Sequence, residues 1–186
     1  MKREFIFALI LLPVSLFLCL AYSSTKTEVT CRDITYKLWT IHDKYDTYFI
    51  ENKANHMRDQ LRYEVGSNPV HYYSYATGMG EFADVDTTSF NSIVRSVFTP
   101  EEIRRYTDAR GGIYIGFVVD PNSGRVLEVR FDLTANKQDT GVFTELLTME
   151  KFYQLEKQFK ENLVCGISEK LKSQKQSYTL AGINLF

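Results

Sequence analysis

The sequence predicts an α+β fold, in which an antiparallel sheet carries two or three helices packed on one of its faces. Three observations lead to this prediction. Apolar residues alternate with polar ones in several short segments, a helix-capping box stands at residues 99–102, and residues 149–164 carry an apolar stripe at helical spacing. In the C-terminal part, residues 89–186, these elements follow one another as helix, β-hairpin, helix and strand.

The chain begins with the features of a secretory signal peptide. Lys2 and Arg3 precede an apolar run over residues 5–20, and small residues follow it. We therefore expect a signal peptide over residues 1–23, cleaved before Ser24, and export to the periplasm or cell envelope. The apolar run holds 16 residues, fewer than the roughly 20 that a membrane-spanning helix needs. Two alternatives stay open, a retained N-terminal membrane anchor and a lipid attached to Cys19.

The mature chain is nearly neutral. Cleavage removes Lys2, Arg3 and Glu4 and leaves 20 basic and 22 acidic residues, a net charge of −2. The sequence holds no basic tract that could follow a phosphate backbone. We therefore expect no nucleic-acid partner, and contact with a membrane only through a retained or lipidated N-terminus. Hydrophobic residues make up 44% of the chain and aromatic residues 14%, enough for a sizeable core.

Residues 24–88 form an aromatic-rich N-terminal part whose pattern favours strands. Ile34, Tyr36 and Leu38 alternate with more polar neighbours, which predicts one strand. The run 45–50 predicts a second strand, and the turn-forming residues that follow it indicate where that strand ends.

The rest of the N-terminal part is less regular. Residues 57–65 fit either a strand or one face of a helix, and we favour the strand. Another strand is expected at 70–75, after a break that contains Pro69. Residues 77–88 are expected to form a long loop at the boundary with the C-terminal part.

Two helices are predicted after this loop. The first is short and covers residues 89–98. Thr99 then caps a second helix, Pro100 occupies its first position, where the missing donor is not needed, and Glu102 completes the capping box. This helix is expected to end before the glycine pair at 111–112.

A β-hairpin follows, with its turn at residues 120–124. Pro121 fixes one φ angle in the turn, and Gly124 accepts a positive φ. Each strand alternates between a core-facing side and a side that we expect to be wet. The expected core-facing residues are Ile113, Ile115, Phe117, Val119, Leu127, Val129, Phe131 and Leu133.

The last two elements are a helix and a strand. Thr148 caps the helix over residues 149–164, and Gly166 ends it. The final strand, residues 177–186, is expected to pair within the sheet and to lie at an edge, where it could take a partner strand. The buried stripe of the helix is expected to be Met149, Phe152, Leu155, Phe159 and Leu163.

Two cysteines remain after cleavage, Cys31 and Cys165. A disulfide between them is possible in an oxidising compartment. The alternative is two unlinked thiols, because the sequence does not show whether the two Cα atoms lie within about 7 Å.

The sequence contains no recognisable motif for a catalytic, cofactor or metal site. His42, His56 and His71 lack the short spacing of zinc ligands, which favours structural or surface histidines. Asp84 and Asp86 resemble the start of a calcium loop, but its glycine and bidentate glutamate are missing. No base can be placed beside either cysteine. We therefore expect no metal, no cofactor and no enzyme.

The C-terminal part resembles two families. Its hairpin, its helix over 149–164 and the last residues Gly182-Ile183-Asn184-Leu185-Phe186 resemble the C-terminal domain of TonB-type energy transducers. That resemblance implies a similar fold, but a transducer also needs a proline-rich spacer, and this chain has four scattered prolines. The capping box, the hairpin over 118–131 and the helix over 152–162 resemble an uncharacterised family of secreted Bacteroidetes proteins, which implies no catalytic residues.

Two function classes follow from the sequence. We favour an exported, noncatalytic binding or envelope-associated protein of unknown ligand, whose partner would be a protein or glycan of the envelope. It would bind through a sheet edge or through its aromatic N-terminal part. The alternative is a secreted enzyme whose site is assembled from scattered residues. The tyrosines that could line a ligand groove, or simply fill a sheet, are Tyr36, Tyr45, Tyr48, Tyr63, Tyr72, Tyr73 and Tyr75.

Overall fold

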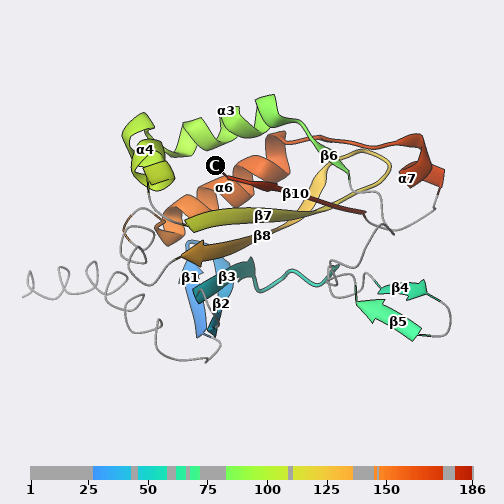
Figure 1. Ribbon diagram of the computed structural model, residues 1–186, viewed down its shortest axis with the longest axis horizontal. Helices are drawn as coiled ribbons and strands as arrows, with labels where there is room; N and C mark the ends of the chain where they lie inside the picture. Colours follow the sequence, from blue (N-terminus) through green and yellow to red (C-terminus); the bar gives the residue numbers. More distant parts are fainter. Residues whose placement is uncertain are drawn as a thin grey trace, which may run out of the picture.

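A six-stranded antiparallel sheet organises the protein. Its strands are β1 (Thr27–Cys31), β2 (Ile34–His42), β3 (Asp46–Asn52), β7 (Gly111–Val119), β8 (Val126–Ala135) and β10 (Thr179–Asn184). They lie in the order β1-β2-β3-β8-β7-β10, and helices pack on one face of the sheet (Figure 1). The predicted α+β fold is confirmed. This computed structural model describes residues 27–42, 46–57, 62–65, 68–71, 83–108, 111–135, 145, 147–173 and 179–185.

Strands β1, β2 and β3 confirm that the N-terminal part favours strands. A two-residue turn joins β1 to β2, because Cys31 pairs with Ile34. Tyr36, Leu38 and Ile50 are buried on the face that the helices cover, called the inner face below. Residues alternate across a strand, so the neighbours of these three side chains lie on the opposite, outer face.

Smaller pairings lie outside the main sheet. A hairpin is formed by β4 (Arg62–Val65) and β5 (Asn68–His71), which confirms the predicted strands at 62–65 and 70–71. Met57 is not part of a strand, and Pro69, expected in a break, belongs to β5. The other residues of the two predicted strands, 58–61 and 72–75, lie outside the described residues. The region expected to be a loop contains β6 (Asp84–Val85), which pairs with β9 (Cys165–Gly166). Gly166 therefore belongs to a strand, and the preceding helix ends earlier than expected.

The two predicted helices after the loop are present. The first, α3 (Thr87–Val97), begins two residues before the predicted start. Its N-cap is Asp86, whose carboxylate accepts hydrogen bonds from Thr88 N at 3.0 Å and from Ser89 Oγ at 2.5 Å. The acidic residue that resembled a calcium ligand is thus a helix cap.

The capping box of α4 (Pro100–Asp108) is confirmed. The backbone N of Thr99 donates to Glu102 Oε2 at 2.9 Å, and the backbone N of Glu102 donates to Thr99 Oγ1 at 3.2 Å. Lys151 also contacts Glu102, and together with the box it holds the pKa of the Glu102 carboxyl below its usual value.

Strands β7 and β8 confirm the hairpin but contain a β-bulge. Val118 pairs with Glu128 and Val119 pairs with Val126, so Leu127 is the extra residue of the bulge. The bulge shifts the alternation by one position, and Val126 takes the core place expected for Leu127. The prediction for Leu127 is therefore wrong, whereas the other expected core residues of the hairpin are buried.

The outer side of β8 is not wet, which corrects a second prediction. Glu128 and Arg130 are only 6% and 8% exposed. The segment 53–57, which continues from β3, meets this side of the strand and bonds to Glu128. Alternation within one strand cannot reveal a cover that comes from a segment about 70 residues earlier.

The core lies between the sheet and α6 (Met149–Asn162). Phe159 packs edge-on against Phe117 of β7 at 5.2 Å between ring centroids, and it stacks on Phe90 of α3 at 5.4 Å. Phe152 contacts Phe131 of β8 at 4.9 Å. The predicted buried stripe is confirmed apart from Met149, which is half-buried. Among the described residues, none of the helices has the length and apolar character needed to cross a membrane.

The end of the chain forms the expected strand. β10 pairs with β7 and lies at an edge of the sheet. Ala181 and Leu185 are buried, and Ile183 packs against the core. The connector before it, where no element was expected, contains the short helix α7 (Glu169–Ser173).

Gly124 provides a sharp test of the hairpin turn. It has φ +73°, and a Cβ there would lie 2.3 Å from the carbonyl oxygen of Cys165. We expect Gly124→Ala to lower the free energy of unfolding by at least about 1–3 kcal/mol, because strain and steric overlap add. Urea unfolding measures this change.

Gly112→Ala is the matched control. Its Cβ would meet no atom within 4 Å, so the free energy of unfolding should change by less than about 1 kcal/mol. Equal losses in the two variants would contradict the described contact between the turn and β9.

Candidate functional site

Buried polar side chains are few and gather around β8 and α6. In the described part of the chain they are Asn52, Glu128, Arg130 and Glu156. Burying a charge is costly unless it is paired and hydrogen-bonded. The partners of each group therefore indicate whether it serves structure or chemistry.

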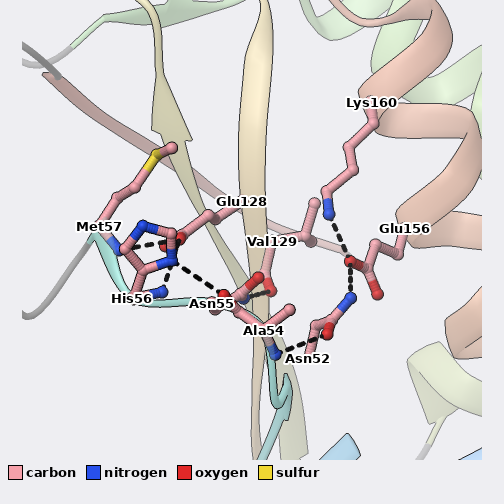
Figure 2. A network of polar contacts seen from close by, with 9 residues as sticks. All are labelled: Asn52, Ala54, Asn55, His56, Met57, Glu128, Val129, Glu156 and Lys160. Atoms are coloured by element: carbon pink, nitrogen blue, oxygen red, sulfur yellow. Dashed lines mark hydrogen bonds and ion pairs between the residues drawn. The ribbon is translucent and has the colours of Figure 1, made fainter. Parts of the chain in front are cut away.

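Glu156 lies on the buried side of α6 and is 1% exposed. Its Oε1 accepts hydrogen bonds from Lys160 Nζ at 2.6 Å and from Asn52 Nδ2 at 2.9 Å (Figure 2). Asn52 Oδ1 in turn accepts from the backbone N of Ala54 at 2.9 Å. These bonds join α6 to the end of β3.

Tyr36 lies close to this group. Its side chain is fully buried. Burial is the main reason why the pKa of its hydroxyl is raised, and the nearby Glu156 carboxylate raises that pKa further. Within the described residues, neither Tyr36 Oη nor Glu156 Oε2 has a hydrogen-bond partner. A tyrosine hydroxyl and a carboxylate therefore lie close together in a buried part of the core.

Glu128 lies on the outer face and accepts hydrogen bonds from backbone groups, whereas those that Glu156 accepts come from side chains. Its Oε1 accepts hydrogen bonds from the backbone N atoms of His56 and Met57 at 2.7 and 2.8 Å (Figure 2). Asn55 Nδ2 donates to the carbonyl oxygen of Val129 at 2.9 Å. The segment 53–57 thereby satisfies polar groups of β8 beyond the end of β3.

The two buried glutamates do not form a catalytic pair. Glu156 comes from the helix layer, whereas Glu128 projects from the outer face of β8, so the sheet lies between them (Figure 2). The Oε1 atom of each carboxylate is engaged in structural hydrogen bonds. General acid–base catalysis would require both groups to reach one substrate, and this arrangement does not allow it.

A row of side chains crosses three strands on the outer face. Trp39 of β2 stacks on Phe49 of β3, with 5.1 Å between ring centroids and 10° between the ring planes. Arg130 lies on the next strand, β8, and its Cζ atom is 5.0 Å from the centroid of the Phe49 ring. Asp132 holds the guanidinium with two bonds of 2.6 Å. We call Trp39, Phe49, Arg130 and Asp132 the outer row.

The outer row is partly accessible. Trp39, Phe49 and Asp132 are half-buried, and the neighbouring Ile41 is 54% exposed. Trp39 is the only tryptophan of the chain. Aromatic side chains and arginine are enriched at binding interfaces, so this row is the candidate binding surface.

The sequence contained a partial indication of this row. Trp39 falls on the polar side of the alternation that predicts β2, and Arg130 and Asp132 are two residues apart on one strand. A strand places such residues on the same face. The pairing of Trp39 with Phe49 and of Phe49 with Asp132 depends on strand order, which the sequence did not indicate.

The structure does not bring the two cysteines together. Both are free thiols. Cys31 Sγ donates to Glu150 Oε2 at 3.7 Å near the start of α6, whereas Cys165 follows the end of that helix. A helix of 14 residues spans about 21 Å, far beyond the reach of a disulfide.

Neither thiol is activated. Burial, with the nearby Glu150 carboxylate, raises the pKa of the Cys31 thiol, and burial raises the pKa of Cys165 to about 11. A reactive cysteine needs a lowered pKa, since the thiolate is the nucleophile.

The remaining candidate residues belong to different elements. His42, His56 and His71 lie in β2, after β3 and in β5. No group of three or more potential metal ligands is found among the described residues. Of the seven tyrosines that could line a groove, Tyr36 and Tyr48 belong to the inner face and Tyr63 lies in β4. The other four fall outside the described residues, as does the expected signal peptide. An open hollow on α3 is lined by Thr88, Asn91, Ser92, Arg95 and Ser96.

Lys160 tests the role of the buried carboxylate. We expect Lys160→Met to lower the free energy of unfolding by about 1–3 kcal/mol, because Glu156 loses a charged partner in a buried place. Chemical denaturation measures the loss.

Lys157→Met is the matched control on the same helix. Lys157 Nζ lies 4.0 Å from Glu161, and both side chains are 54% exposed, so this change should cost less than about 1 kcal/mol. If Lys157→Met proved as costly as Lys160→Met, the Glu156 network would not be the reason.

The comparisons with known proteins agree with the fold. No family model matches the chain, and no curated protein does. The crystal structure of a DUF5043 family protein from Bacteroides uniformis is similar, with a TM-score of 0.61 and 17% sequence identity over 89% of this chain and 86% of that chain. At this identity the likeness concerns the fold alone. It is consistent with the predicted resemblance to an uncharacterised Bacteroidetes family, whereas the resemblance to TonB remains a prediction.

Proposed function

We propose that this protein is an exported, noncatalytic binding protein of the cell envelope, and that the outer row contacts its ligand. The observation that carries the proposal is the stack of Trp39, Phe49 and Arg130 across three neighbouring strands. Such a stack presents two half-buried aromatic rings, and the buried Arg130 supports the Phe49 ring from the neighbouring strand.

The fixed geometry of the row supports binding. Asp132 holds the Arg130 guanidinium at two points, and a planar, bidentate pair loses little freedom when a ligand arrives. The aromatic rings are also rigid, so they lose little conformational entropy when a ligand binds. A sheet face of this kind suits an extended ligand, either a protein surface or a glycan of the envelope, better than a small molecule that needs an enclosing pocket.

Trp39 makes the proposal measurable. Because it is the only tryptophan, a ligand on the outer row should change the protein's tryptophan emission directly. We would titrate the purified protein first with envelope glycan fragments and then with envelope proteins. We expect one of these fractions to change the emission saturably, and Phe49→Ala to weaken that binding roughly tenfold.

Tyr153→Ala is the control, because Tyr153 is a half-buried aromatic residue of α6. It should bind as the unchanged protein does. A ligand from either fraction that binds the folded Phe49→Ala and Asp132→Ala variants with unchanged affinity would contradict the role of the outer row.

Export is tested separately. We expect the protein recovered from the envelope fraction to begin at Ser24, because the N-terminus has the three parts that signal peptidases recognise. Intact-mass measurement decides this point. A mass that still includes residues 1–23 would contradict cleavage and favour the anchored alternative.

A further inference from the structure

The two edges of the sheet differ in their protection. At one edge, β1 carries Glu28, whose carboxylate bonds Lys53 Nζ at 2.8 Å. At the other edge, the sequence of β10 is TLAGIN, which contains neither a charge nor a proline. Natural sheets usually protect their edges with such residues, because an unpaired edge invites another strand.

One side of the β10 backbone pairs with no strand of the described part of the chain. Leu185 N donates to Ile113 O at 2.8 Å, which places the hydrogen bonds to β7 at Leu185 and at every second residue before it. The N–H and C=O groups of Leu180, Gly182 and Asn184 therefore point away from β7. Among the described residues, no strand pairs with this side, although β6 lies close to β10.

Gly182 stands in the middle of this side of β10. A Cβ at this position would lie 1.9 Å from Tyr114 Oη, so the absent side chain lets the Tyr114 ring lie across the strand. Glycine inside a strand often marks a close approach of another backbone. At the centre of the edge, Gly182 has no side chain, and the Tyr114 ring packs against it.

We propose that this edge of β10 pairs with β10 of a second copy of this chain, antiparallel about a two-fold axis at Gly182. Leu180 of each copy then bonds Asn184 of the other, and the two Gly182 residues exchange their N–H and C=O bonds. An extended backbone is the partner that satisfies alternating donors and acceptors.

The chain's own strand fits this register. On the inner face, the small Ala181 of one copy meets the larger Ile183 of the other, which would cover the half-buried Ile183. No like charges face each other, because the six residues are uncharged. An interface centred on one strand is small compared with the roughly 1,200 Å² of stable complexes, so we expect a dimer that depends on concentration.

Two variants test this pairing by sedimentation velocity over a range of concentrations. Asn184→Pro removes an outward N–H and leaves the β7 bonds intact, and Asn184→Lys adds the charge that protects natural edges. We expect the unchanged protein to shift from monomer to dimer as its concentration rises. Both variants should remain monomeric.

Thr30→Pro is the matched control, since it removes an outward N–H from the protected edge at β1, and it should dimerise normally. Amide hydrogen exchange adds an independent measure, because the Gly182 N–H should become protected only in the dimer. A protein that stays monomeric at all concentrations, or a dimer that persists in both Asn184 variants, would overturn the proposal. Pairing of β10 with a different protein instead of a second copy would overturn it as well.

Discussion

The packing of α6 on the inner face of the sheet is the constraint on which the rest of the structure depends. Phe152 and Phe159 contact the hairpin strands, and Phe159 also holds α3 in place. The start of the helix is tied to the β1–β2 turn, where Arg32 Nε donates to Glu150 at 3.1 Å. With one face of the sheet sealed in this way, only the outer face and the edges are left to contact other molecules.

The positions of the buried polar side chains depend on the same packing of α6 against the sheet. The end of β3 lies beside α6, and Asn52 and Lys160 both donate hydrogen bonds to Glu156, which is buried there. On the outer face, Glu128 accepts hydrogen bonds from backbone N atoms of the segment that follows β3. These bonds fix the segment 53–57 beside β8, while Arg130 is held against Phe49. The hydrogen bonds of Glu128 thus position the segment that covers part of the outer face.

The sequence was informative where structure is local. The capping box at Thr99 and the inner-face alternation of β7 depend on neighbours in the chain, and both were predicted correctly. The bulge at Leu127, the cover over Glu128 and the separation of Cys31 from Cys165 depend on distant segments, so one sequence could not reveal them. The outer row lies between these cases, because the face of Trp39 followed from alternation but its neighbours followed from strand order.

The accessibility of Trp39 tests most directly the claim that the helices cover the inner face of the sheet, whereas the outer face at β2 and β3 is accessible. Acrylamide quenches exposed tryptophan and barely affects buried tryptophan, and this chain has a single tryptophan. We expect quenching in the native protein to be clearly measurable and to lie between the values for the unfolded chain and for a core residue, because the Trp39 side chain is half-buried. Quenching as weak as that of a fully buried tryptophan would contradict the account.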